Sequence, residues 1–169
     1  VENVEALQAE LDIELKSAQE ALSAELVPLA EMIGDSALFT LEQELRTKES
    51  DLAEIESRLQ GLQETLNTLG ARQDAAPQEL SEARAALSDL QIRLIAFGEG
   101  ELEVLSEARR TEIEARIWYR RNHIRAIEQE IATLPARQDL VTRRRAVADV
   151  QAQILRRDVA RISARTGQK

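Results

Sequence analysis

The sequence predicts an all-α fold, an elongated bundle of long antiparallel helices that pack in the manner of a coiled coil. Charged residues make up 31% of the chain and aromatic residues 2%, a composition typical of long helices rather than of a globule with a thick core. Only three prolines and six glycines interrupt the 169 residues. The chain has no alternating strand pattern, whereas residues 38–69 carry an unbroken heptad seam.

The first predicted helix covers residues 2–33. Its apolar positions repeat with steps of three, four and four residues, an eleven-residue period that favours a nearly straight stripe. These positions are Val4, Leu7, Leu11, Leu15, Ala18, Leu22, Leu26, Leu29 and Ile33. Pro28 removes one backbone hydrogen bond and is expected to kink the helix. Gly34 is expected to end it.

The second predicted helix, over residues 37–69, is the central one because it carries the heptad seam. The seam positions are Leu38, Leu41, Leu45, Lys48, Leu52, Ile55, Leu59, Leu62, Leu66 and Leu69. Such a narrow stripe winds helices into a left-handed coiled coil, and it must pack against other helices. Lys48 is the one seam residue that is not apolar, and we expect its charged end to reach water.

Residues 70–76 are predicted to form a loop, because Gly70 is typical of the position after a helix and Pro77 of a first helical turn. The third predicted helix therefore covers residues 77–97. A tight reversal follows at residues 98–100. Since short connections favour antiparallel neighbours, we expect the third helix to be antiparallel to both the second and the fourth.

The fourth predicted helix covers residues 101–134 and the fifth covers residues 136–164. Pro135 separates them, because proline inside a helix kinks or breaks it. The stripe of the fifth helix is rich in β-branched residues, which are weaker helix formers, so packing must stabilise it. All these helices are expected to form one elongated domain over residues 1–169.

Charge is distributed unevenly along a chain whose net charge is −9. Residues 1–100 hold 21 acidic and 7 basic side chains, whereas residues 101–169 hold 10 acidic and 15 basic ones. The net acidity argues against nucleic acid as a partner. The basic part either pairs with the acidic helices of the same fold or faces anionic lipid or an acidic partner.

The composition of the chain says little about the cellular compartment in which it is found. The absence of cysteine is compatible with an oxidising compartment such as the periplasm, and equally with the cytosol. No run of roughly 18 apolar residues is present, so we expect no transmembrane segment in these residues. Because the chain starts at Val1 rather than at methionine, we expect a mature chain or a piece of a larger protein.

Groups that could carry out catalysis are scarce, and we expect no enzyme, no cofactor, no metal site and no small-molecule substrate. The single histidine, His123, cannot build a typical metal site in a chain without cysteine. His123 and the nearby Arg125 only partly resemble the phospho-acceptor helix of histidine kinases. In that helix an acidic residue follows the histidine, whereas here Ile124 follows it. A surface or groove position on a helix is the simpler interpretation of His123.

Two clusters are candidate contact sites for a partner or for lipid. Trp118 and Tyr119 are adjacent and have arginines around them, and such rings suit half-wet positions. We favour the simpler interpretation, in which one ring packs into a seam between helices. Arg143, Arg144 and Arg145 make the last helix basic, so they either contact phosphate groups or pair with the acidic helices.

Several segments together resemble a known family. A leucine-heptad helix ends in Leu66-Asn67-Thr68-Leu69, and a later helix pair includes Glu128-Gln129-Glu130 before Leu134-Pro135. Between them, a segment that begins with proline carries Pro77, Leu80, Ala83, Leu87, Leu90 and Leu94. In these features, over residues 37–165, the chain resembles the helical N-terminal periplasmic region of large MscS-superfamily mechanosensitive channels of the MscK type.

The resemblance implies a non-catalytic domain outside the inner membrane, ahead of the transmembrane helices that the rest of the full-length protein would supply. Its expected role is to self-associate within a homo-oligomeric channel, to contact sister subunits or envelope components, and to modulate gating under osmotic stress. No pore or ion-binding residue of the family has a counterpart in this chain. Two alternatives stay open, a coiled-coil arm of a cytosolic SMC-like ATPase and a histidine-kinase dimerisation domain.

Overall fold

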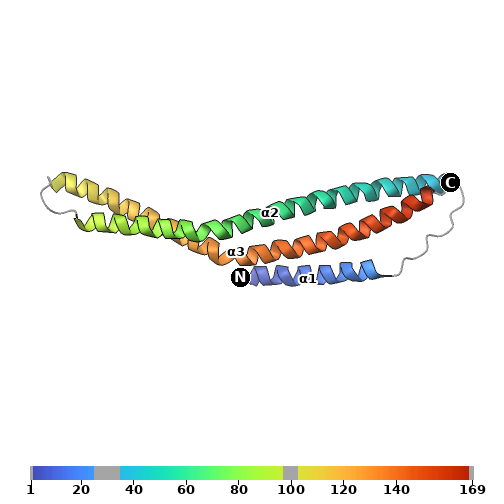
Figure 1. Cartoon of the computed structure of the whole chain (residues 1–169), viewed down its shortest axis with the longest axis horizontal. Helices are drawn as coiled ribbons and strands as arrows, with labels where there is room; N and C mark the ends of the chain where they lie inside the picture. The colour runs from blue at the N-terminus through green and yellow to red at the C-terminus, as the bar shows by residue number, and fades with distance from the viewer. Residues whose placement is uncertain (1, 25–34, 97–102, 168–169) are drawn as a thin grey trace. The chain divides into compact units, whose positions relative to one another are not determined.

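The computed structural model describes residues 2–24, 35–96 and 103–167, and these form α-helices and no strand (Figure 1). The helices are α1 (Glu2–Ser23), α2 (Asp35–Ala96) and α3 (Glu103–Thr166). The all-α class predicted from composition and the heptad seam is therefore confirmed. None of the three described helices contains an apolar stretch that could span a bilayer.

The chain divides into two compact units. Unit 1 comprises Val1–Asn67 together with Gln138–Lys169, and unit 2 comprises Thr68–Arg137. Helices α2 and α3 each contribute one part to either unit, whereas α1 belongs to unit 1 alone.

In unit 1, α1 lies beside α3, as Figure 1 shows for the blue and the orange-to-red segments. The side-chain amide of Gln8 donates a hydrogen bond to Asp139 over 2.7 Å, and Arg157 donates to the carbonyl oxygen of Leu22 over 2.7 Å. Residue numbers rise together along both helices, so α1 and α3 run parallel. The predicted kink at Pro28 and the predicted end of the first helix lie outside the described residues.

The predicted heptad seam is the packed face of α2. All ten seam positions from Leu38 to Leu69 are half-buried, Lys48 included, whereas most positions between them are exposed. An ion pair of 2.9 Å between Glu56 and Arg156 joins this helix to α3 in unit 1. The buried apolar residues of α3 in this unit are Val147, Ala148, Val150, Ala152 and Ile162.

In unit 2, α2 and α3 form an antiparallel pair around a small apolar core. Ala76, Ala83, Ile124 and Ile127 are buried there, and Leu80, Leu87 and Ile131 pack against them. Arg72 pairs with Glu130, and Arg84, further along α2, pairs with Glu128, which comes earlier in α3. The predicted antiparallel arrangement of the helices before and after residues 98–100 is confirmed, and the reversal itself lies outside the described residues.

The prediction of a loop over residues 70–76 is wrong, because α2 continues through these residues and through Pro77. Gly70 is helical and does not adopt the left-handed conformation that ends helices. Ala76 is 0% exposed in the core of unit 2, and Arg72 pairs with Glu79 across the proline. The packing of the whole unit 2 core to which Ala76 belongs, rather than these two contacts alone, offsets the roughly 3 kcal/mol that a proline costs inside a helix. The second and third predicted helices are therefore one helix, not antiparallel neighbours.

The prediction of separate helices before and after Pro135 is also wrong, because α3 runs through the proline. Leu134, the residue before it, is 2% exposed and is among the most deeply buried side chains of the described chain. The burial of a leucine contributes about 2 kcal/mol, which offsets much of the cost of the backbone hydrogen bond that Pro135 cannot make.

Candidate functional site

The predicted contact residues Trp118 and Tyr119 lie on the surface of unit 2. Their side chains are 69% and 62% exposed, so the favoured interpretation, in which one ring packs into a helix seam, is wrong. Trp118 borders a groove of about 510 Å³ between α2 and α3. The residues that line this groove are Gln91, Leu94, Ile95, Glu114, Ile117, Trp118 and Arg121.

The groove combines a buried apolar base with exposed apolar edges. Ile117 is buried and Leu94 is half-buried, whereas Ile95 is 84% exposed. Beside it, the rings of Tyr119 and His123 stack with centroids 6.3 Å apart and planes inclined by 8°. His123 is exposed, which confirms the prediction of a surface position. An apolar hollow with an exposed tryptophan at its edge is suited to binding another apolar surface.

The other predicted cluster, the arginines of residues 143–145, belongs to unit 1. Arg143 is half-buried and forms ion pairs with Asp12 of α1 and with Asp139, the latter over 2.9 Å. The hydrogen bonds that the Arg143 guanidinium donates to Asp139 and Asp12 raise the pKa of Arg143 above its ordinary value. This side chain fastens α1 to α3, as the pairing of basic and acidic helices predicts.

Arg144 and Arg145 differ from Arg143 in their surroundings. Both are exposed, and within the described residues neither makes an ion pair or a hydrogen bond. A role for these two arginines in contact with a partner or with lipid therefore stays a prediction.

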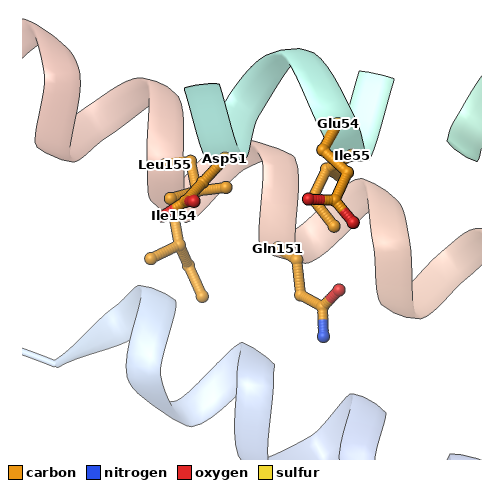
Figure 2. A pocket seen from close by; sticks show the side chains of 6 residues that line it. All are labelled: Asp51, Glu54, Ile55, Gln151, Ile154 and Leu155. Atoms are coloured by element: carbon orange, nitrogen blue, oxygen red, sulfur yellow. The ribbon is translucent and has the colours of Figure 1, made fainter. Parts of the chain in front are cut away.

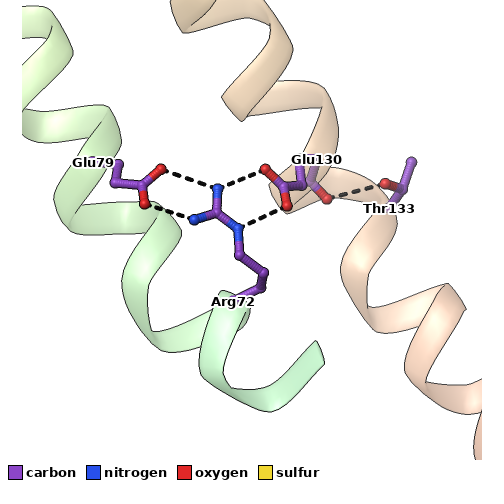
Figure 3. A network of polar contacts seen from close by, with 4 residues as sticks. All are labelled: Arg72, Glu79, Glu130 and Thr133. Carbon is purple, nitrogen blue, oxygen red and sulfur yellow. Dashed lines mark hydrogen bonds and ion pairs between the residues drawn. The ribbon is translucent and has the colours of Figure 1, made fainter. Parts of the chain in front are cut away.

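A polar cluster that the sequence did not reveal lies in unit 2 at Arg72 (Figure 3). The guanidinium donates two hydrogen bonds to Glu79, of 2.6 and 3.0 Å, and two to Glu130 on α3, of 2.9 and 2.8 Å. Thr133 donates to the carbonyl oxygen of Glu130 over 3.0 Å. Arg72 and Glu79 are seven residues apart, a spacing that puts them on one helical face, but the predicted loop concealed this signal.

The Arg72 cluster changes the acidity of its members. Hydrogen bonds to Glu130 and Glu79 raise the pKa of Arg72, and hydrogen bonding to Arg72 lowers the pKa of both carboxyl groups. All three groups are thus held in their charged forms. Bidentate pairing of this kind fixes geometry, so the cluster sets the register of α2 against α3 in unit 2.

A second hollow lies between α2 and α3 in unit 1, lined by Asp51, Glu54, Ile55, Gln151, Ile154 and Leu155 (Figure 2). Figure 2 shows the amide of Gln151 pointing toward the light-blue ribbon of α1, where it donates to Glu14 over 3.2 Å. Two carboxylates approach the hollow, but the described residues contain no group of three or more His, Cys, Asp or Glu side chains that could hold a metal ion.

Comparison with known families decides the identity of this helical chain. Residues 3–169 match the model of the family described as the mechanosensitive ion channel porin domain. The chain belongs to this family. The match confirms the resemblance to the N-terminal region of MscS-superfamily channels of the MscK type, and it extends over more of the chain than the residues that predicted it. Neither curated protein sequences nor solved structures give a match.

Proposed function

We propose that this mechanosensitive channel porin domain is a non-catalytic periplasmic domain that contributes to channel assembly and to the modulation of gating. The observation that carries the proposal is the family match, because it includes nearly all of the chain and all three described helices. The contacts of the described residues support a structural role. The Arg72 and Arg143 clusters both fasten one helix to another and fix the packing of each unit.

The periplasmic placement is tested by thiol labelling of the full-length channel. This domain has no cysteine, so a single cysteine at exposed Ser57 or Ser88 would be its only reactive thiol. We expect a membrane-impermeant maleimide to label it in cells whose outer membrane alone has been permeabilised. A cytosolic marker protein with an exposed thiol serves as the control and must stay unlabelled. Labelling that requires lysis of the inner membrane would contradict the placement and favour a cytosolic coiled-coil arm.

The role in assembly and gating is tested by deleting residues 1–169 from the full-length channel. We expect the deletion to change either the recovery of the assembled channel or the membrane tension at which half of the channels open. Native electrophoresis measures the first quantity and patch-clamp recording the second. If both stay at their wild-type values, this domain contributes to neither process.

A further inference from the structure

Exposed large apolar side chains are concentrated at one place in unit 2. Among the described residues, those at or near the groove are Ile92, Ile95, Trp118 and Tyr119, and the remaining two are Ile13 and Phe39 in unit 1. Exposure of each of these apolar side chains to water is unfavourable, so a group of them on one surface indicates a site that another molecule covers. We therefore expect the groove to bind a partner whose surface complements the residues that line it.

The charge beside the groove is positive. Residues 115–127 contain four arginines and no carboxylate, and the carboxylate that lines the groove, Glu114, pairs with Arg110 over 3.0 Å. Arg121 lines the groove, and Arg125 follows it by one helical turn on the same face as Trp118. Both arginines are exposed, and within the described part of the chain neither forms an ion pair. A partner with carboxylates around an apolar side chain would complement this surface.

Helix α1 presents such a surface. It carries six carboxylates and one lysine, and its Ile13 is 71% exposed. Glu10, Lys16 and Glu20 are also exposed and lie on the same helical face as Ile13, so this face carries two carboxylates and one ammonium group. Another face of α1 is engaged with α3 through Asp12 and Gln8. The face that holds Ile13 is thus available while α1 remains packed in its own unit 1.

We propose that the groove of unit 2 binds the exposed face of α1 of a second copy of this chain. Ile13 enters the groove beside Trp118 and Ile95, and Glu10 lies near Arg121. Because the two surfaces differ, each copy binds one neighbour through its groove and another through its α1 face. Such head-to-tail contacts generate rings or open chains. The inference rests on the proposed role in assembly and names the surfaces that carry it out.

The test measures self-association of the 169-residue chain by sedimentation velocity and by the emission of Trp118, its only tryptophan. Association should rise with concentration and move the emission to shorter wavelength as the indole leaves water. Arg121→Glu and Ile13→Ser should each raise the dissociation constant about tenfold or more. Added salt should weaken association, because part of the attraction is electrostatic. Phe39→Ser is the matched control for Ile13→Ser, because it also removes an exposed apolar side chain from unit 1. It should leave association unchanged.

Mixing the two defective variants distinguishes this contact from any symmetric one. Arg121→Glu retains an intact α1 face and Ile13→Ser retains an intact groove, so together they should form pairs but nothing larger. Circular dichroism confirms that each variant keeps its helices. The proposal is overturned if the chain stays monomeric at all concentrations, if the mixture forms no pairs, or if Phe39→Ser weakens association equally. It is also overturned if anionic vesicles shift the Trp118 emission of a chain that remains monomeric, which would assign the groove to lipid. None of these outcomes changes the result of the thiol labelling.

Discussion

Replacing Gly70 with alanine should stabilise unit 2, and the sign of the effect tests the continuity of α2. Gly70 is half-buried within the helix and has no positive φ angle. A Cβ atom built on it has no neighbouring atom within 4 Å, so the added methyl group meets no obstacle. Alanine should therefore gain the full difference in helix propensity over glycine.

The gain should be about 0.5–1 kcal/mol, which is the cost of glycine relative to alanine inside a helix. For a domain of this size, about 1 kcal/mol corresponds to a rise in melting temperature of roughly 2–4 °C. If Gly70 instead ended a helix in the left-handed conformation, alanine would cost about 1 kcal/mol or more. The two structures of this segment therefore predict changes of opposite sign.

The assay is urea unfolding, followed by circular dichroism for total helix and by Trp118 fluorescence for unit 2, to which Gly70 also belongs. Gly61→Ala is the matched control, because Gly61 is helical in both the predicted and the observed fold and a Cβ atom there is also unobstructed. A stabilised Gly61→Ala variant beside a destabilised Gly70→Ala variant would show that the helix ends near residue 70 and would refute the continuous α2.

Three further predictions concern packing and charge. Leu134→Ala should lower the free energy of unfolding by about 2–5 kcal/mol, whereas Leu134→Met should lower it by less than about 1.5 kcal/mol. Chemical denaturation measures both changes, and equal losses would show that Leu134 is not closely packed. Arg72 lowers the pKa of Glu79 and of Glu130 below the ordinary glutamate value of 4.5. The stabilisation from this pairing is therefore fully present above pH 4.5, and it is lost as the pH falls through the lowered pKa values of the folded protein. Melting temperatures between pH 7 and pH 3 should therefore fall less steeply in Arg72→Gln than in the wild type, and identical slopes would contradict the role of the cluster. Arg143→Gln should speed amide hydrogen exchange in α1 more than in the unit 2 part of α2, and protection that falls equally in both would mean that Arg143 does not fasten α1.

Much of the fold could be predicted because helical periodicity is a local property of the chain. The ten seam positions, steps of three and four residues apart, are all half-buried on α2. The breaks predicted at residues 70–76 and at Pro135 were wrong, because glycine and proline report only a local cost. A cost of about 1–3 kcal/mol is offset when residues such as Ala76 and Leu134 are buried by a second helix.

The candidate site could be predicted only in part. Trp118 was a recognisable candidate from its arginine neighbours, but its exposure and the groove beside it depend on α2 residues that are more than twenty positions away, such as Leu94 and Ile95. The role of Arg143 was open between lipid and acidic helices until the structure placed Asp12 against it. Composition identifies which charges exist, whereas it does not identify their partners.

By itself, the sequence determined the helical state, the packed face of α2 and the opposite charges of the two parts of the chain, since all three follow from residue type and spacing along one helix. The tertiary structure alone decided where helices continue and which charges meet. Arg72 and Glu130 are 58 residues apart, and Arg143 and Asp12 are 131 apart. Contacts at such separations depend on how helices pack, and their energies outweigh the local preferences of single glycines and prolines.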